Sequence, residues 1–151
     1  MAISIALGTD HAGFELKEKI KVWLDQNKYQ YHDFGCYSLE SVDYPDYGLK
    51  VAEAVANKEY IFGITICGSG IGICIVANKV PGIRASLCTN LAMAKMARSH
   101  NNANILCLGG RDTDHDLALK IVEVWLSTPF SEEPRHKRRI DKISLIEKKF
   151  I

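Results

Sequence analysis

Short apolar runs alternate along the whole chain with stretches in which apolar residues recur every three or four positions. The apolar runs have the length and the β-branched content of strands, and they lie at residues 3–8, 29–35, 61–67, 83–88 and 103–110. A segment of helical period follows each run, so the βα pattern occurs five times. A last helix is expected from Arg135 to about Lys149, after Pro134.

This alternation predicts a fold class. Apolar strands joined by helical crossovers indicate a single Rossmann-like, doubly wound α/β domain over residues 1–151. We expect a five-stranded parallel sheet with helices on both faces and a C-terminal helix. Ligands of such sheets bind beyond the carboxyl ends of the strands. The candidate segments are therefore those that follow each strand, at residues 8–11, 34–36, 67–72, 88–90 and 109–112.

Composition excludes several function classes. The 151 residues include 19 Lys and Arg against 18 Asp and Glu, a net charge of +1, which gives no global attraction to nucleic acid or to an acidic membrane. The chain shows no signal-peptide pattern and no apolar run long enough to span a membrane, so a cytoplasmic protein is expected. Its five cysteines lie mostly in apolar segments, which favours reduced thiols, and their spacing does not indicate zinc.

The glycine loop CGSGIG, residues 67–72, is the first candidate for chemistry. It does not match the dinucleotide-binding fingerprint, so no nicotinamide cofactor is expected. Its backbone N–H groups, at the start of a helix, suit a developing negative charge. Cys67 beside them is placed to act as a nucleophile or a proton acceptor. From position alone, Cys67 could equally be a small buried hydrophobe.

Titratable side chains outside the glycine loop are further candidates for catalysis. His11 and Asp10 follow the first strand, and His100 ends a helix. With Cys67 at the same rim, they would supply groups that work near neutral pH. His32, His115 and His136 are expected to be solvated.

Three arginines form the candidate anion site. Arg135 and Arg139 share one helix face, near a helix start that disfavours positive charge unless an anion is bound. Arg111, after the fifth strand, is a third candidate for the same anion. A small phosphorylated metabolite fits this set, although such a basic run is often only a solvated face.

Five motifs, in order, resemble the type B ribose-5-phosphate isomerases and the related galactose-6-phosphate isomerase subunits over nearly the whole chain. They are GTDHAGFELK, SVDYPDYG, CGSGIGICIVANKVPGIRASLC, HNNANILCLGGR and RHKRRIDKI. The resemblance implies isomerisation of ribose 5-phosphate to ribulose 5-phosphate without metal or cofactor. It also implies a homodimer whose active sites use residues of both subunits, and it leaves open whether dimers pair into tetramers.

The resemblance also implies roles for individual residues. Cys67 would be the base and Ser69 the assisting hydroxyl, while His100 would open the sugar ring with Asp10 nearby. Tyr44 would form a wall of the sugar site. The amides of Gly68, Gly70, Ile71 and Gly72, with Asn101 of the other subunit, would hold the enediolate. The phosphate would bind His11, Arg111, Arg135 and Arg139. Family members that lack the cysteine use a glutamate just after the loop, where this chain has Ile73.

Other functions stay open at this point. The substrate could be allose 6-phosphate or galactose 6-phosphate, because pocket depth cannot be read from sequence. A cysteine-dependent hydrolase or transferase would form a covalent adduct on Cys67. A binding module that uses the basic helix for a phosphosugar or for nucleic acid is a third interpretation.

Overall fold

The computed structural model describes residues 2–151. Five parallel strands form one sheet in the order β2-β1-β3-β5-β4. The strands are β1 (Ser4–Thr9), β2 (Gln30–Asp33), β3 (Phe62–Cys67), β4 (Ala85–Leu87) and β5 (Ile105–Gly109). The strand order reverses between β1 and β3, at the centre of the sheet. The expected five-stranded parallel sheet is confirmed.

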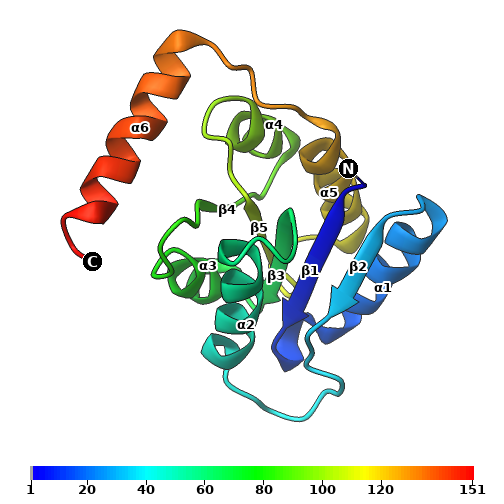
Figure 1. The fold of residues 1–151 in the computed structure, drawn as a ribbon. Helices are drawn as coiled ribbons and strands as arrows, with labels where there is room; N and C mark the ends of the chain where they lie inside the picture. The colour runs from blue at the N-terminus through cyan, green and yellow to red at the C-terminus, as the bar shows by residue number, and fades with distance from the viewer. Residues whose placement is uncertain (1) are drawn as a thin grey trace.

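Helices cover both faces of this sheet (Figure 1). They are α1 (Phe14–Gln26), α2 (Tyr44–Ala56), α3 (Ile71–Ala77), α4 (Leu91–Ser99), α5 (His115–Ser127) and α6 (Pro134–Lys148), with a 3-10 turn η1 (His11–Gly13) before α1. One core joins the sheet to α1, α4 and α5, and the other joins it to α2 and α3. The doubly wound arrangement expected from the sequence is therefore also confirmed.

The central strands β1, β3 and β5 are mainly apolar because both of their faces are buried. The edge strand β2, with the sequence QYHD, is only partly buried. In β5, Leu106 and Leu108 point into the core with α1, α4 and α5, whereas Ile105 and Cys107 point into the core with α2 and α3. All four side chains are fully buried. An apolar run without polar alternation is what a covered parallel strand requires.

The C-terminal helix α6 is arranged differently from the others. It stands away from the sheet, beyond α4 and β4 (Figure 1). Near its end, the Glu147 carboxylate accepts a hydrogen bond of 2.8 Å from the Gly82 amide. A cavity of about 610 Å³ lies between α6, β4 and α4, and Ile143 and Ile146 of α6 line it. Helix α6 thus lies along the β4 edge without covering either face.

Among residues 2–151, no helix is both long enough and apolar enough to cross a membrane.

Candidate active site

The Cys67 thiol lies at the carboxyl end of β3, next to the point where strand order reverses. The residue is 4% exposed, and its Sγ accepts a hydrogen bond of 3.2 Å from the Gly70 amide. Gly70 has a φ of 79°, a left-handed conformation that favours glycine, and it turns the chain back into α3. The turn therefore brings a backbone donor onto the sulfur.

The loop after β5 holds the glycine loop from the other side. The Gly110 amide donates to the Cys67 carbonyl at 2.8 Å, and the Arg111 amide donates to the Gly68 carbonyl at 3.0 Å. A Cβ at Gly109 would lie 2.7 Å from the Ser69 carbonyl oxygen, so a side chain does not fit between the loops. This close approach fixes the loop carbonyls, while the Gly70 and Ile71 amides donate to Cys67 Sγ and Ser69 Oγ at the start of α3.

Ser69, Tyr44 and Arg111 surround this loop. Ser69 Oγ accepts from the Ile71 amide at 3.2 Å, which leaves its own hydrogen free for a ligand. The Tyr44 ring lies against Gly72, where a Cβ would come within 2.6 Å of it. The Arg111 stem passes over Gly68, and the residue is exposed. The structure brings these side chains together with Cys67.

Asp10 and His11 lie at the same edge, after β1. The buried Asp10 carboxylate caps η1, and accepts from the amides of Ala12 at 2.9 Å and Gly13 at 3.3 Å. His11 Nδ1 accepts from the Val42 amide at 3.1 Å, so in the neutral ring Nε2 carries the proton. The Val42 contact is a backbone interaction that no side-chain motif could have indicated.

His100 and Asn101 lie at the opposite edge of the sheet. Helix α4 starts after the carboxyl end of β4 and returns, so its C-terminal cap, His100, reaches the amino edge. The Asn101 carbonyl accepts from Nε of Arg84, the residue just before β4, at 3.0 Å. The expectation that His100 shares a rim with Cys67 within one chain is therefore wrong. Within the chain, Asp10 and His100 are also at opposite edges.

The basic end of α6 lies beside His100. The rings of His100 and His136 lie against each other at a tilt of 33°, with centroids 4.3 Å apart, and His136 Nδ1 lies 2.8 Å from Ser131 Oγ. Arg135 and Arg139 are exposed, and Arg135 pairs with Glu133 at 2.8 Å. The structure thus brings His100, Asn101 and the two arginines of α6 to one edge.

His136 was expected to be solvated, and this expectation is wrong. The residue is 4% exposed. Removal from water, with His100 as the next contribution, lowers the pKa of His136 below its usual value. Sequence reasoning missed this ring because it sits within a run of charged residues.

His115 is half-buried, with Nε2 at 2.9 Å from the Gly110 carbonyl and Nδ1 at 2.9 Å from Lys19 Nζ.

Comparison with known proteins gives the family. The family model of the ribose/galactose isomerases matches residues 5–143. Ribose-5-phosphate isomerase B of Escherichia coli is 43% identical, over 96% of this chain and 97% of that protein. The structure of Clostridium thermocellum ribose-5-phosphate isomerase B superposes with a TM-score of 0.96 at 54% identity, and covers 99% of this chain and 100% of that one.

A further solved structure carries a ligand. Ribose-5-phosphate isomerase B of Mycoplasma genitalium, with bound ribulose 5-phosphate, is similar with a TM-score of 0.92 and 41% identity over 98% of both chains. The similarity extends over nearly the whole chain in each comparison. The chain belongs to the ribose/galactose isomerase family.

Proposed function

We propose that this protein interconverts ribose 5-phosphate and ribulose 5-phosphate through an enediolate, with Cys67 as the base. The observation that carries the proposal is the Cys67 thiol in contact with the Gly70 amide at the carboxyl end of β3. The chain's 43% identity to Escherichia coli ribose-5-phosphate isomerase B supports the choice of substrate. Within the glycine loop, Cys67 and Ser69 are the only side chains that can exchange a proton.

The proposed reaction moves one carbon-bound proton. As a thiolate, Cys67 removes the proton from C2 of the open-chain aldose, and the electron pair forms the C1–C2 double bond of the enediolate. The amides of Gly68, Gly70, Ile71 and Gly72 stabilise the charge of the enediolate. Those of Gly70 and Ile71 would exchange their acceptors, Cys67 Sγ and Ser69 Oγ, for the substrate oxygens. The Ser69 hydroxyl relays a proton from O2 to O1, and the Cys67 thiol then gives its proton to C1. Ile73, just after the loop, is fully buried and cannot accept a proton.

Binding the phosphate requires groups from both edges of the sheet. His11 and Arg111 are available beside Cys67, and Arg135 and Arg139 lie at the opposite edge of the same chain. We infer a homodimer in which α6 and the end of α4 of one subunit complete the site of the other. His100 of that subunit would open the sugar ring, with Asp10 nearby, and Asn101 would help hold the enediolate. Tyr44 would line the sugar.

Exposed apolar side chains support this second subunit. Ile71 and Ile75 of α3 are 55% and 56% exposed, and Ile143 and Ile146 of α6 are 45% and 56% exposed. Exposed isoleucines on a helix face are typical of surfaces that another chain covers. A two-fold axis would bury both helices at once, since each subunit presents the same surface.

We infer three further properties. The chain acts as a single domain, because its two cores share one sheet. The reaction needs no redox cofactor, because the isomerisation leaves the substrate with no net oxidation or reduction, and in this proposal the loop amides stabilise the enediolate in place of a metal. We also infer a cytoplasmic enzyme, since a small phosphorylated metabolite is expected there.

The proposal is tested by following the formation of ribulose 5-phosphate from ribose 5-phosphate by the purified protein, with allose 6-phosphate and galactose 6-phosphate assayed in parallel. Conversion of the pentose phosphate is expected. Conversion of a hexose phosphate alone would retain the proton transfer and replace the substrate. If neither class is converted and mass spectrometry finds an adduct on Cys67, the protein is a covalent transferase or hydrolase and the proposal is wrong.

A further inference from the structure

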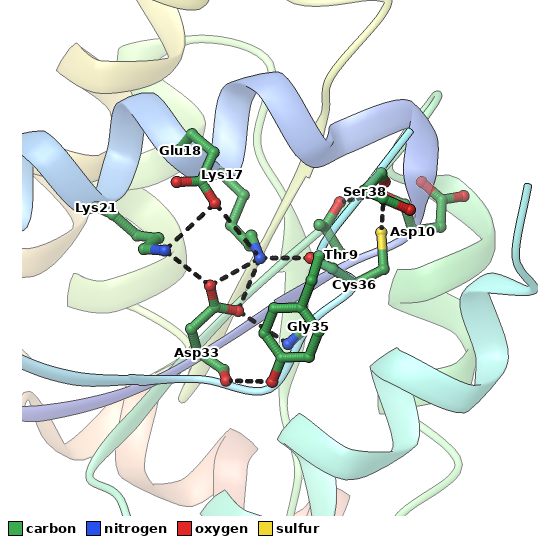
Figure 2. Close-up of polar contacts among 10 residues, drawn as sticks. Thr9, Asp10, Lys17, Glu18, Lys21, Asp33, Gly35, Cys36 and Ser38 are labelled. Atoms are coloured by element: carbon green, nitrogen blue, oxygen red, sulfur yellow. Dashed lines mark hydrogen bonds and ion pairs between the residues drawn. The ribbon is translucent and has the colours of Figure 1, made fainter. Parts of the chain in front are cut away.

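Lys17 of α1 is fully buried in the interior of the domain. Its ammonium donates to both oxygens of Asp33, at 2.8 and 2.7 Å, and to the Cys36 carbonyl at 2.5 Å (Figure 2). These three acceptors use all three N–H bonds of the ammonium. The Phe14 and Tyr37 rings lie 5.4 and 5.0 Å from it. Lys17 therefore has no donor left for a substrate.

Asp33, at the end of β2, supplies the negative charge opposite the Lys17 ammonium. Its carboxylate also accepts from the Gly35 amide at 2.8 Å and pairs with Lys21 at 3.0 Å. Burial opposes ionisation of Asp33, but hydrogen bonds from Lys17, the Gly35 amide and Lys21 outweigh it and hold its pKa below the usual value. A buried ion pair contributes little net stability against an apolar replacement. The role of this ion pair is therefore better inferred from the residues that it holds in place than from its contribution to stability.

This pair reaches the active site through the backbone. The Cys36 amide donates to the Thr9 carbonyl at 2.7 Å, and the Thr9 amide donates to the Gly35 carbonyl at 2.7 Å. Thr9 ends β1 and directly precedes Asp10, which caps the turn that carries His11. Gly35 and Cys36, which Asp33 and Lys17 hold, thus hydrogen-bond to Thr9 at the end of β1. His11 follows two residues later.

The other end of the same segment also touches the site. Residues 34–43 run from β2 to α2, and their centre, residues 37–41, is exposed. Near the end of this segment, the Val42 amide donates to His11 Nδ1 at 3.1 Å. Tyr44, which packs on Gly72, follows immediately. The segment is fixed by Lys17 and Asp33 at its start and by His11 and Tyr44 at its end.

We propose that Lys17, through its buried pair with Asp33, is a positioning residue that sets the substrate-binding orientation of His11 and Tyr44. The inference rests on the proposed isomerase function, in which His11 binds the phosphate and Tyr44 lines the sugar. Lys17 acts only through the segment 34–43 and contacts neither the thiol nor the glycine loop. Its loss should therefore weaken substrate binding more than it slows proton transfer.

The first test is Lys17→Met, which keeps the length of the buried stem and removes the charge. We expect KM for ribose 5-phosphate to rise on the order of tenfold while kcat changes less than about threefold. The rate of Cys67 alkylation should stay unchanged. The matched control is Lys21→Met, which removes a charge from the same carboxylate without touching Cys36, and KM should change less than about twofold. An unchanged KM in folded Lys17→Met protein, with only lower thermal stability, would show a purely structural role.

The second test is a double-mutant cycle with His11. The part of the effect that acts through His11 is absent in a His11→Ala background, so Lys17→Met should raise KM there by clearly less than the roughly tenfold expected in the wild-type background, and the remainder should act through Tyr44. Full additivity of the two changes would contradict the inference. Should Lys17→Met fail to fold, the neutral pair Lys17→Met with Asp33→Asn should fold and show the same rise in KM. If that also fails to fold, Asp33→Asn alone should raise KM by about threefold, and an unchanged KM would overturn the inference.

These outcomes separate the two proposals. A wild-type protein that does not convert ribose 5-phosphate would remove the proposed function. Wild-type activity with an unchanged KM in the folded variants would remove only the positioning role of Lys17.

Discussion

The two edges of the sheet carry two differently built halves of the candidate site. At the carboxyl edge, Cys67 is 4% exposed and its loop is held by backbone hydrogen bonds from Gly110 and Arg111. At the amino edge, the Arg135 side chain is 58% exposed and pairs only with a neighbouring exposed carboxylate. The first half is part of the packed domain, whereas the second lies on a helix that stands apart. One chain therefore presents the proposed reactive centre and, at the opposite edge, the proposed anion-binding surface.

Among changes at the two edges, loss of Cys67 at the carboxyl edge should have the largest effect, and the effect should appear in kcat. We expect Cys67→Ala to lower kcat by about a thousandfold, since it removes the proposed base, while substrate binding is retained. Steady-state kinetics and equilibrium binding of ribose 5-phosphate would measure both. Cys74→Ala, which changes a half-buried thiol in α3, is the control and should keep normal kcat. Near-normal activity of Cys67→Ala would assign the proton transfer to another group.

Mixing two inactive variants tests whether the halves come from different chains. Cys67→Ala damages the carboxyl edge and His100→Ala the amino edge. In a mixed dimer with shared sites, one of the two sites has neither change. Random pairing should then restore about a quarter of wild-type activity after subunit exchange. If exchange is verified and no activity returns, the sites are not shared in this way.

A smaller effect is expected at the exposed helix. Arg139→Ala should raise KM for ribose 5-phosphate by about tenfold, because it removes a charged hydrogen-bond donor to the phosphate. The free energy of unfolding should change by less than about 0.5 kcal/mol, since the residue is exposed. Lys137→Ala, on another face of α6, is the matched control for lost charge. Equal changes in KM for both variants would indicate a general field of charge rather than a specific contact.

The smallest expected effect concerns acid stability at the carboxyl edge. The pKa of Asp33 lies below its usual value in the folded protein, so the unfolded chain binds more protons there. This contribution to stability is present above the usual carboxyl pKa of about 4 and is lost as pH falls toward the folded value. Urea unfolding between about pH 3 and 6 should show an added slope of at most about 1.4 kcal/mol per pH unit. The slope should be absent in Lys17→Met with Asp33→Asn.

Sequence pattern predicts the sheet and the place of Cys67 for the same physical reason. Parallel strands buried on both faces read as apolar runs, and the residue after such a run must lie at the carboxyl edge. The same logic could have placed His100. A helix that starts at the carboxyl edge returns to the amino edge, so a residue at its C-terminus cannot lie beside Cys67 in the same chain.

Other features depend on contacts between distant elements. Lys17 lies next to the apolar positions Leu16 and Ile20 of α1, but a lysine there is expected to reach solvent. Its burial depends on Asp33 and the Cys36 carbonyl, which no local pattern in α1 can indicate. His136 is likewise buried by packing against a ring from another helix. Such pairings are set by tertiary packing.

The hydrogen bonds from Gly110 and Arg111 to the carbonyls of Cys67 and Gly68 also set an order of assembly during synthesis. The ribosome completes the glycine loop well before β5, and β5 must then insert between β3 and β4. Until the chain through Arg111 has emerged, the thiol loop lacks the donors that fix its carbonyls. The proposed reactive centre is therefore completed late in translation, when a strand from the second half of the chain enters the sheet.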